Sequence, residues 1–148
     1  MRIATFDCFS GISGDMCLGA LVSAGWPAAE LEALPARLRI EGARIEVRAT
    51  RRGPFAATQV VVQVDEGRQP HRHLHHIEAL LAAAEIAPQV RDRARAVFTR
   101  LAEAEAEVHG STVQNVHFHE VGAVDALVDV VGTIEGLRAL GVVKVFGT

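Results

Sequence analysis

The sequence predicts a layered α+β (or α/β) domain in which several helices pack on a mixed β-sheet. Candidate strands and helices follow one another in the order β-α-α-β-β-α-α-β-α-β, and a hairpin-like strand pair interrupts the crossover pattern of a parallel sheet. The length of 148 residues suits one hydrophobic core better than two. We therefore expect residues 1–148 to form a single domain.

The first part of the chain predicts a strand, a tight turn and two helices. Residues 2–9 carry apolar and β-branched side chains, which favours a buried strand. Ser13 is a typical N-cap and Gly25 a typical stop signal, so a helix is expected between them. Over 27–38, leucines recur at spacings of three and four residues and predict a second amphipathic helix.

The later elements follow from the same signals. Two stretches rich in β-branched residues, 44–50 and 58–64, flank an Arg-Arg-Gly-Pro segment and predict a hairpin or a looser antiparallel pair. Helical spacing of apolar residues, with Pro and Gly at the boundaries, defines the rest. The remaining expected elements are helices over 74–84, 88–110 and 123–140 and strands over 113–121 and 142–146.

Composition and charge argue against several classes of protein. With 15 basic against 18 acidic residues the net charge is −3, which lacks the basic footprint of a nucleic-acid binder. No apolar run approaches the roughly 18–20 residues that span a bilayer, and the N-terminus lacks the features of a secretory signal, so we expect a cytoplasmic protein. Two cysteines, Cys8 and Cys17, are too few for a disulfide scaffold and are expected to pack in the core.

The first motif that carries chemistry is DCFSGISGD, residues 7–15, which follows a strand and opens a helix. Its turn presents backbone N–H groups that suit a phosphate or carboxylate, and Asp7 and Asp15 could hold a divalent cation. The alternative is that Ser13 and Asp15 merely cap the helix. The candidate ligand-binding residues of the turn are Ser10, Gly11, Ser13 and Gly14.

The second motif is a dense run of histidines, HRHLHH, at a helix entrance. Neutral imidazole suits nickel, zinc, copper and iron, and the absence of thiolates in the run argues against a cysteine-rich structural zinc site. The alternative is a solvated histidine-rich turn with adventitious metal affinity. The candidate metal ligands are His71, His73, His75 and His76.

The third motif is VHFHE, residues 116–120, followed by a helix with two acids. On a strand, His117 and His119 project to one face, with Phe118 opposite in the core. On the helix, Asp125 and Asp129 lie four residues apart and form a polar stripe with Thr133. Together with Glu120 these histidines and aspartates form a plausible nitrogen–oxygen metal or proton-transfer site. The alternative is that Asp125 completes the helix N-terminus and Asp129 pairs with an arginine.

The first and third motifs, together with the histidine run, resemble those of the LarC-type nickel-insertion proteins over nearly the whole chain. The resemblance implies a nickel chelatase (cyclometallase) that inserts Ni²⁺ into pyridinium-3,5-bisthiocarboxylic acid mononucleotide. The product is the nickel pincer cofactor of lactate racemase and related enzymes. In that family CTP hydrolysis and Mg²⁺ or Mn²⁺ accompany the reaction.

Members of that family are longer, so the resemblance implies the N-terminal domain of a larger architecture, without its C-terminal nucleotide-binding region. Nothing in the chain matches a CTP site, so whether it is an enzyme by itself stays open. Expected partners are the pyridinium mononucleotide, a C-terminal partner chain and further copies in a homo-oligomer. The histidines would bind nickel together with Asp129; the candidate catalytic residues are Asp7, Asp15, Glu120 and Asp125.

Two rival functions follow from the same residues. One is a nickel metallochaperone or storage module that binds the ion without catalysis. The other is a zinc- or magnesium-dependent phosphohydrolase that uses the histidine and aspartate clusters. An insertion enzyme transfers nickel in a nucleotide-dependent way, whereas a metallochaperone or storage module does not. Turnover of phosphate esters would support the phosphohydrolase.

Overall fold

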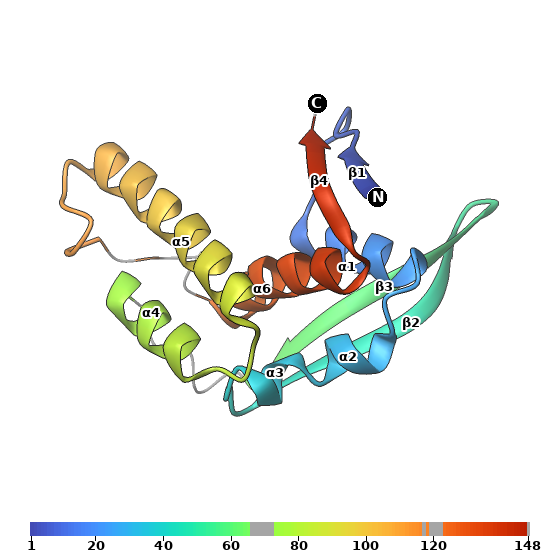
Figure 1. Cartoon of the computed structure of the whole chain (residues 1–148), viewed down its shortest axis with the longest axis horizontal. Coiled ribbons are helices and arrows are strands. Elements are labelled where there is room, and N and C mark those ends of the chain that lie inside the picture. The colour runs from blue at the N-terminus through green and yellow to red at the C-terminus, as the bar shows by residue number, and fades with distance from the viewer. Residues whose placement is uncertain (66–72, 117, 119–122, 148) are drawn as a thin grey trace.

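The computed structural model describes residues 1–65, 73–116, 118 and 123–147, and its architecture is α+β as predicted. Figure 1 shows α6 in the middle, α4 and α5 on one side of it, and a long hairpin of β2 and β3 on the other. In chain order the elements are β1 (Arg2–Phe6), α1 (Gly14–Ser23), α2 (Ala28–Glu32), α3 (Leu34–Arg37), β2 (Ala43–Arg52), β3 (Phe55–Val64), α4 (Leu74–Ala83), α5 (Pro88–His109), α6 (Val124–Ala139) and β4 (Val142–Gly147).

The described strands pair in both directions, in two separate pairs. β1 and β4 run parallel, with Ile3 opposite Lys144 and Thr5 opposite Phe146. β2 and β3 form the predicted antiparallel hairpin, closed by Gly53 and Pro54. Gly53 has a φ of +57°, a left-handed conformation that glycine adopts without strain.

The core lies around α6, which packs against α1, α3 and α5. Two glycines on α6 allow close packing: a Cβ on Gly132 would lie 2.7 Å from a methyl of Leu18, and one on Gly136 would lie 2.7 Å from the ring of Trp26. Both Leu18 and Trp26 are buried. Small residues at these positions therefore bring α1 and the segment after it onto the central helix.

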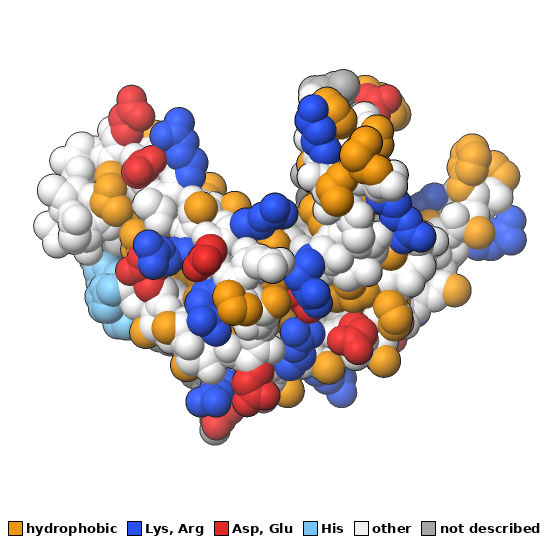
Figure 2. All heavy atoms as spheres, viewed as in Figure 1, with side chains coloured by type: hydrophobic (Ala, Val, Ile, Leu, Met, Phe, Trp, Pro, Cys, Tyr) orange, Lys and Arg blue, Asp and Glu red, His pale blue; other side chains and the backbone are white. Residues whose placement is uncertain are grey.

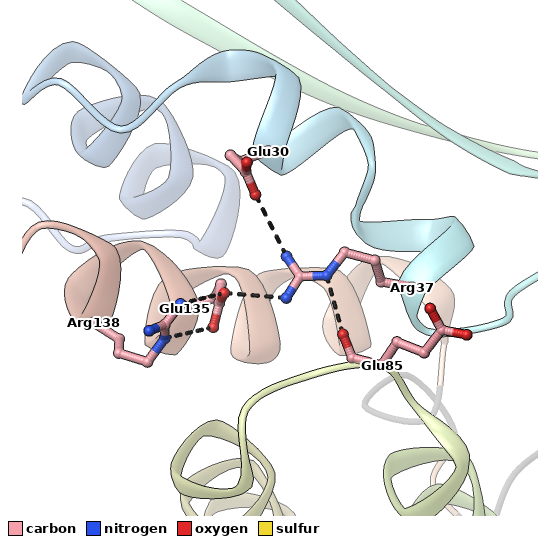
Figure 3. A network of polar contacts seen from close by, with 5 residues as sticks. All are labelled: Glu30, Arg37, Glu85, Glu135 and Arg138. Carbon is pink, nitrogen blue, oxygen red and sulfur yellow. Dashed lines mark hydrogen bonds and ion pairs between the residues drawn. The ribbon is translucent and has the colours of Figure 1, made fainter.

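A buried carboxylate of α6, Glu135, belongs to a polar network that links four segments of the chain (Figure 3). Glu135 is 3% exposed and accepts hydrogen bonds from Arg138 at 2.9 and 3.1 Å and from Arg37 at 3.2 Å. Arg37 also donates to the backbone carbonyl of Glu85 at 3.1 Å and forms an ion pair with Glu30 at 3.8 Å. The Arg138 and Arg37 guanidiniums hold the pKa of Glu135 below its ordinary value, although burial opposes them.

Helix ends agree with the sequence signals. Ser13 is the N-cap residue of α1, Pro88 opens α5, and Gly110 follows α5 with a φ of +60°. Gly141, with a φ of +69°, separates α6 from β4. No helix among the described residues is both long and apolar enough to cross a bilayer.

Three predicted elements differ in the structure. The strand predicted over 2–9 ends at Phe6 and is largely exposed. The helix predicted over 27–38 is broken into α2 and α3, because Pro35 has no N–H to bond the carbonyl of Leu31. The strand predicted from residue 113 begins as a turn, in which the amides of Asn115 and Val116 both donate to the Thr112 carbonyl at 3.0 Å.

Candidate functional site

The structure brings the first and third motifs together where the start of α1 meets α6. A Cβ built on Gly14 would lie 2.2 Å from the Cγ atom of Asp129, so the Asp129 carboxyl group rests directly on the Gly14 backbone. Any larger residue at position 14 would displace that carboxyl group. Gly14 was predicted to approach a ligand; in the structure its lack of a side chain makes room for Asp129.

Acidic groups gather around this contact. The half-buried Asp129 has its pKa raised to about 6, first by burial and then by the nearby carboxylates of Asp125 and Asp15. The pKa of the Cys17 thiol is also raised, chiefly by burial and then by Asp129, Cys8 and Asp15. Negative charge held close together in this way favours a cation over an anion at the junction of α1 and α6.

The turn before α1 is built differently from a simple capped helix. Gly11 has a φ of +82°, and its amide donates to the Cys8 carbonyl at 2.9 Å. Within the described chain, the Ser13 hydroxyl donates to Oδ1 of Asp15 instead of accepting a bond from an α1 amide. Ser13 thus occupies the predicted N-cap position, while its side chain orients a carboxylate of the acidic cluster.

The two acids of α6 have different surroundings. Asp125 lies in the first turn, where its Oδ1 atom accepts the amide of Ala126 at 2.9 Å, in agreement with the helix-start interpretation. Asp129 lies one turn further on, and among the described residues the ion pairs on α6 involve Glu135 instead. The alternative, in which Asp129 pairs with an arginine, is therefore not the arrangement that these residues form.

Asp129 and Thr133 line an apolar groove between α5 and α6, as expected for residues of one polar stripe. The groove has a volume of about 430 Å³, and its described lining contains no basic side chain. Its other lining residues are Gly14, Val97, Leu101, Ala126, Val130 and Ile134. A carboxyl group at the wall of an apolar groove can interact with a cationic or metal-bound ligand there.

Three of the four histidines of the second motif are described, and their rings cluster at the start of α4 (Figure 2, pale blue). The ring centroids of His73 and His75 are 5.4 Å apart and nearly parallel, and those of His75 and His76 are 3.9 Å apart. Nδ1 of His73 lies 3.1 Å from the carbonyl oxygen of Val116. The second motif therefore touches the first residue of the third.

These contacts assign different roles to His73 and His76. A carbonyl oxygen accepts, so Nδ1 of His73 donates to Val116 and its Nε2 keeps a lone pair in the neutral ring, the usual arrangement of a metal-binding histidine. Nδ1 of His76 instead accepts the backbone N–H of His73 at 3.2 Å. In that tautomer Nε2 of His76 carries the proton, so this ring serves to cap α4.

The predicted ligand set is only partly described. Among the described residues, no three His, Cys, Asp or Glu side chains are grouped so that they could hold a metal ion. The predicted metal ligands His71, His117 and His119 and the predicted catalytic Glu120 lie outside the described residues. Phe118, between the two histidines of the third motif, is buried, as the alternating pattern predicted.

Two features of the site were missed by sequence reasoning. Cys8 and Cys17 are partly exposed and not core packing residues, and Cys17 lies within the electrostatic reach of Asp129. Glu135, which the sequence analysis did not single out, is the paired acid of α6. The spacing of Glu135 and Arg138, three residues apart on one helix, is a signal that could have found this pair.

The acidic residues where α1 meets α6 and the imidazole rings at the start of α4 are side chains of the types that bind metal ions, in a protein of the α+β class. Comparison with known proteins is more specific: the model of the nickel insertion protein family matches residues 4–148. The chain belongs to this family.

Its relatives are similar throughout the chain. A protein of Thermomicrobium roseum is 54% identical over 147 residues and one of Synechococcus elongatus is 51% identical over 146; both are named as nickel insertion proteins. A protein of Desulfitobacterium hafniense, 44% identical over 148 residues, is named as a pyridinium-3,5-bisthiocarboxylic acid mononucleotide nickel insertion protein. These matches cover 98–100% of this chain but only 36–37% of the relatives. No solved structure matches the chain.

Proposed function

We propose that this chain is the nickel-handling part of a nickel insertion protein that delivers Ni²⁺ to pyridinium-3,5-bisthiocarboxylic acid mononucleotide. The substrate is the one in the name of the Desulfitobacterium hafniense relative. The observation that carries the proposal is a pair of contacts that link neighbouring motifs: Gly14 contacts Asp129, and His73 contacts Val116. The product would be the nickel pincer cofactor that the family resemblance implies.

The histidine cluster is proposed to collect the ion. His73 offers Nε2 to a metal while its Nδ1 is held by the Val116 carbonyl, and His75 stacks beside it. Imidazole nitrogen is a favourable ligand for Ni²⁺. His71, four residues before His75, is the further predicted ligand, while His76, also predicted as a ligand, is assigned to capping α4 through the His73 amide.

The acidic junction is proposed to form the second site, from which the ion is transferred. Asp129, with His117 and His119 as predicted ligands, would bind Ni²⁺ through oxygen and nitrogen, ligands that a sulfur-rich acceptor displaces readily. Insertion forms a bond between Ni²⁺ and a carbon atom of the pyridinium substrate, and that carbon loses its proton. A carboxylate of the acidic junction can accept this proton. The proposed acceptors are Asp7, Asp15, Glu120 and Asp125.

The turn before α1 is proposed to position the substrate phosphate. Ser10, Gly11, Ser13 and Gly14 lie at the amino end of α1, where backbone N–H groups attract anions. The carboxylates around this turn would repel a free phosphate, so the phosphate would bind together with a divalent cation, for which Mg²⁺ or Mn²⁺ are suited by their oxygen ligands. We assign no residue of this chain to CTP.

The test is a calorimetric titration of the untagged chain with Ni²⁺ and then Zn²⁺ near neutral pH, where imidazole is largely unprotonated. We expect stoichiometric nickel binding, and at least a tenfold loss of affinity in the double variant His73→Ala/His75→Ala. His109→Ala, whose ring pairs with Glu105 on α5, is the matched control and should bind as the wild type does.

A second measurement separates insertion from storage. The nickel-loaded chain is mixed with the pyridinium mononucleotide, CTP and the remaining part of the Thermomicrobium roseum relative as a separate polypeptide. Transfer is followed by the absorption of the nickel product, with Asp129→Asn as the variant. We expect Asp129→Asn to retain nickel on the histidines and to lose transfer. Transfer at the wild-type rate in Asp129→Asn would contradict the role of the acidic junction, and nickel binding unaffected by His73→Ala/His75→Ala would contradict that of the histidines.

A further inference from the structure

The parallel pair of β1 and β4 leaves an apolar surface uncovered. It stands out from the body of the molecule in Figure 1, and it carries exposed hydrophobic side chains (Figure 2, the projection at the top, right of the centre). The exposed fractions are 56% for Ile3, 65% for Val143, 48% for Val145 and 44% for Phe146. Such a concentration on one small pair of strands marks a contact surface more often than ordinary solvent-exposed surface.

The pairing direction makes this exposure unusual. Parallel strands are normally covered on both faces, and a two-stranded sheet is marginal by itself. The described chain adds no third strand to β1 and β4. By contrast, β2 and β3 form an antiparallel hairpin, a pairing that tolerates one solvated face.

One face of the pair is backed by helices and the other is bare. A cavity of about 380 Å³ lies between β1 and the helices, lined by Ala20 and Leu21 of α1 and by Leu137 of α6. The ladder places Ile3 opposite Lys144 and Thr5 opposite Phe146, so these four side chains share a face. Nζ of Lys144 lies 4.7 Å from the centroid of the Phe146 ring. The described residues leave the rest of that face uncovered.

We propose that the β1–β4 pair is the nucleus of a larger sheet, which strands from the remaining part of the longer family architecture complete. The relatives are long enough to supply them, since this chain corresponds to only 36–37% of their length. Added strands would pair with the outer edges of β1 or β4, and the helices that connect parallel strands would cover the face that carries Ile3 and Phe146. The inference rests on family membership and on this surface, and not on the nickel chemistry.

The first test compares hydrogen exchange in this chain with that in the full-length Thermomicrobium roseum relative. The proposal expects the β1 and β4 amides of this chain to exchange at least tenfold faster than the matching segments of the longer protein. The hairpin of β2 and β3 is the internal control and should exchange alike in the two proteins. Equal exchange at β1 and β4 would overturn the proposal.

The second test adds the remaining two thirds of that relative to this chain as a separate polypeptide and measures binding by sedimentation and calorimetry. We expect a one-to-one complex that Phe146→Glu weakens at least tenfold. Val108→Glu, at an 80% exposed position on α5, is the matched control and should bind as the wild type does. A complex that Phe146→Glu leaves intact would overturn the proposal, as would self-association of the chain that protects β1 and β4 without the second polypeptide.

These outcomes are independent of the proposed function. A chain that binds no nickel but shows the expected protection of β1 and β4 supports this inference and counts against nickel handling. The reverse result supports nickel handling alone. Circular dichroism of Phe146→Glu and Val108→Glu confirms that both variants are folded before binding is compared.

Discussion

Two acids on α6 show how position decides what a carboxylate does. Glu135 is buried between the guanidiniums of Arg37 and Arg138, which lower its pKa. Asp129, less than two turns earlier, lies on Gly14 among other acids, and its pKa rises to about 6. The first carboxylate is neutralised by the fold and stabilises it; the second retains a charge that a metal ion can satisfy.

The largest expected effect on stability is at Glu135, the acid that pairs with Arg37 and Arg138. Glu135→Gln keeps the shape but removes the charge that Arg37 and Arg138 share, so we expect a loss of about 3 kcal/mol in the free energy of unfolding at pH 7. Urea denaturation measures it. Glu103→Gln, which removes an exposed ion pair with Arg100, is the control and should change stability by less than about 0.5 kcal/mol.

The pH dependence of that loss has a definite sign. Because the folded pKa of Glu135 lies below its unfolded value of 4.5, its contribution is present above pH 4.5 and disappears as the pH falls through the folded pKa. The difference between Glu135→Gln and the wild type should therefore shrink in acid. A difference that stayed constant down to pH 2 would mean that the charge is not its source.

The second prediction breaks the contact between the first and third motifs. Gly14→Ala places a methyl group where the Asp129 carboxyl lies, so we expect a loss of about 2 kcal/mol, although alanine normally favours a helix. The double variant Gly14→Ala/Asp129→Ala should regain most of that stability. Thermal unfolding of the single and double variants gives the coupling energy, and simple additivity would show that the two residues do not interact.

The third prediction tests how the charge of Asp129 affects the free energy of unfolding. Asp129 binds its proton more tightly folded, with a pKa of about 6, than unfolded, near 3.8, so ionisation destabilises the fold as the pH rises from about 4 to 6. Asp129→Asn should be more stable than the wild type by about 1–2 kcal/mol at pH 7. Below pH 4 the two should converge, the opposite trend to Glu135→Gln. Urea titrations at pH 4, 5 and 7 measure both trends.

The smallest expected effects distinguish the roles of His73 and His76. His76→Ala removes the acceptor for the His73 amide and should lower stability by about 1 kcal/mol, with nickel affinity within about twofold of the wild type. His73→Ala should instead lower nickel affinity about tenfold. Calorimetric nickel titrations paired with thermal unfolding make the comparison, and equal effects of both variants on nickel binding would remove the distinction between the two rings.

Much of the fold could be predicted because its signals are local. Gly110 ends α5, the Gly-Pro pair closes the hairpin, and the leucines of α2 and α3 are buried as their spacing indicated. The predictions that failed depended on competition between signals. Pro35 broke an otherwise regular leucine pattern, and the turn at Thr112 replaced the start of a strand whose composition favoured extension.

The candidate site could likewise be predicted only in part. From the sequence alone one can recognise carboxylates and imidazoles in motifs of nickel-insertion type, because residue type decides which metals a side chain can bind. The arrangement within the site was not recoverable. Nothing near Gly14 in the sequence indicates that Asp129 lies against it, and nothing near His73 indicates a bond to Val116.

The sequence by itself therefore determined the helix ends, the hairpin and the chemical types of ligand, since capping, turn conformation and metal preference act within a few residues. Only the tertiary structure decided which acid of α6 is neutralised and which is left among like charges. That outcome depends on the packing of α3 and α1 against α6, which places Arg37 beside Glu135 and Gly14 beside Asp129. A charge is stabilised by what lies near it in space, and distance along the chain does not set that.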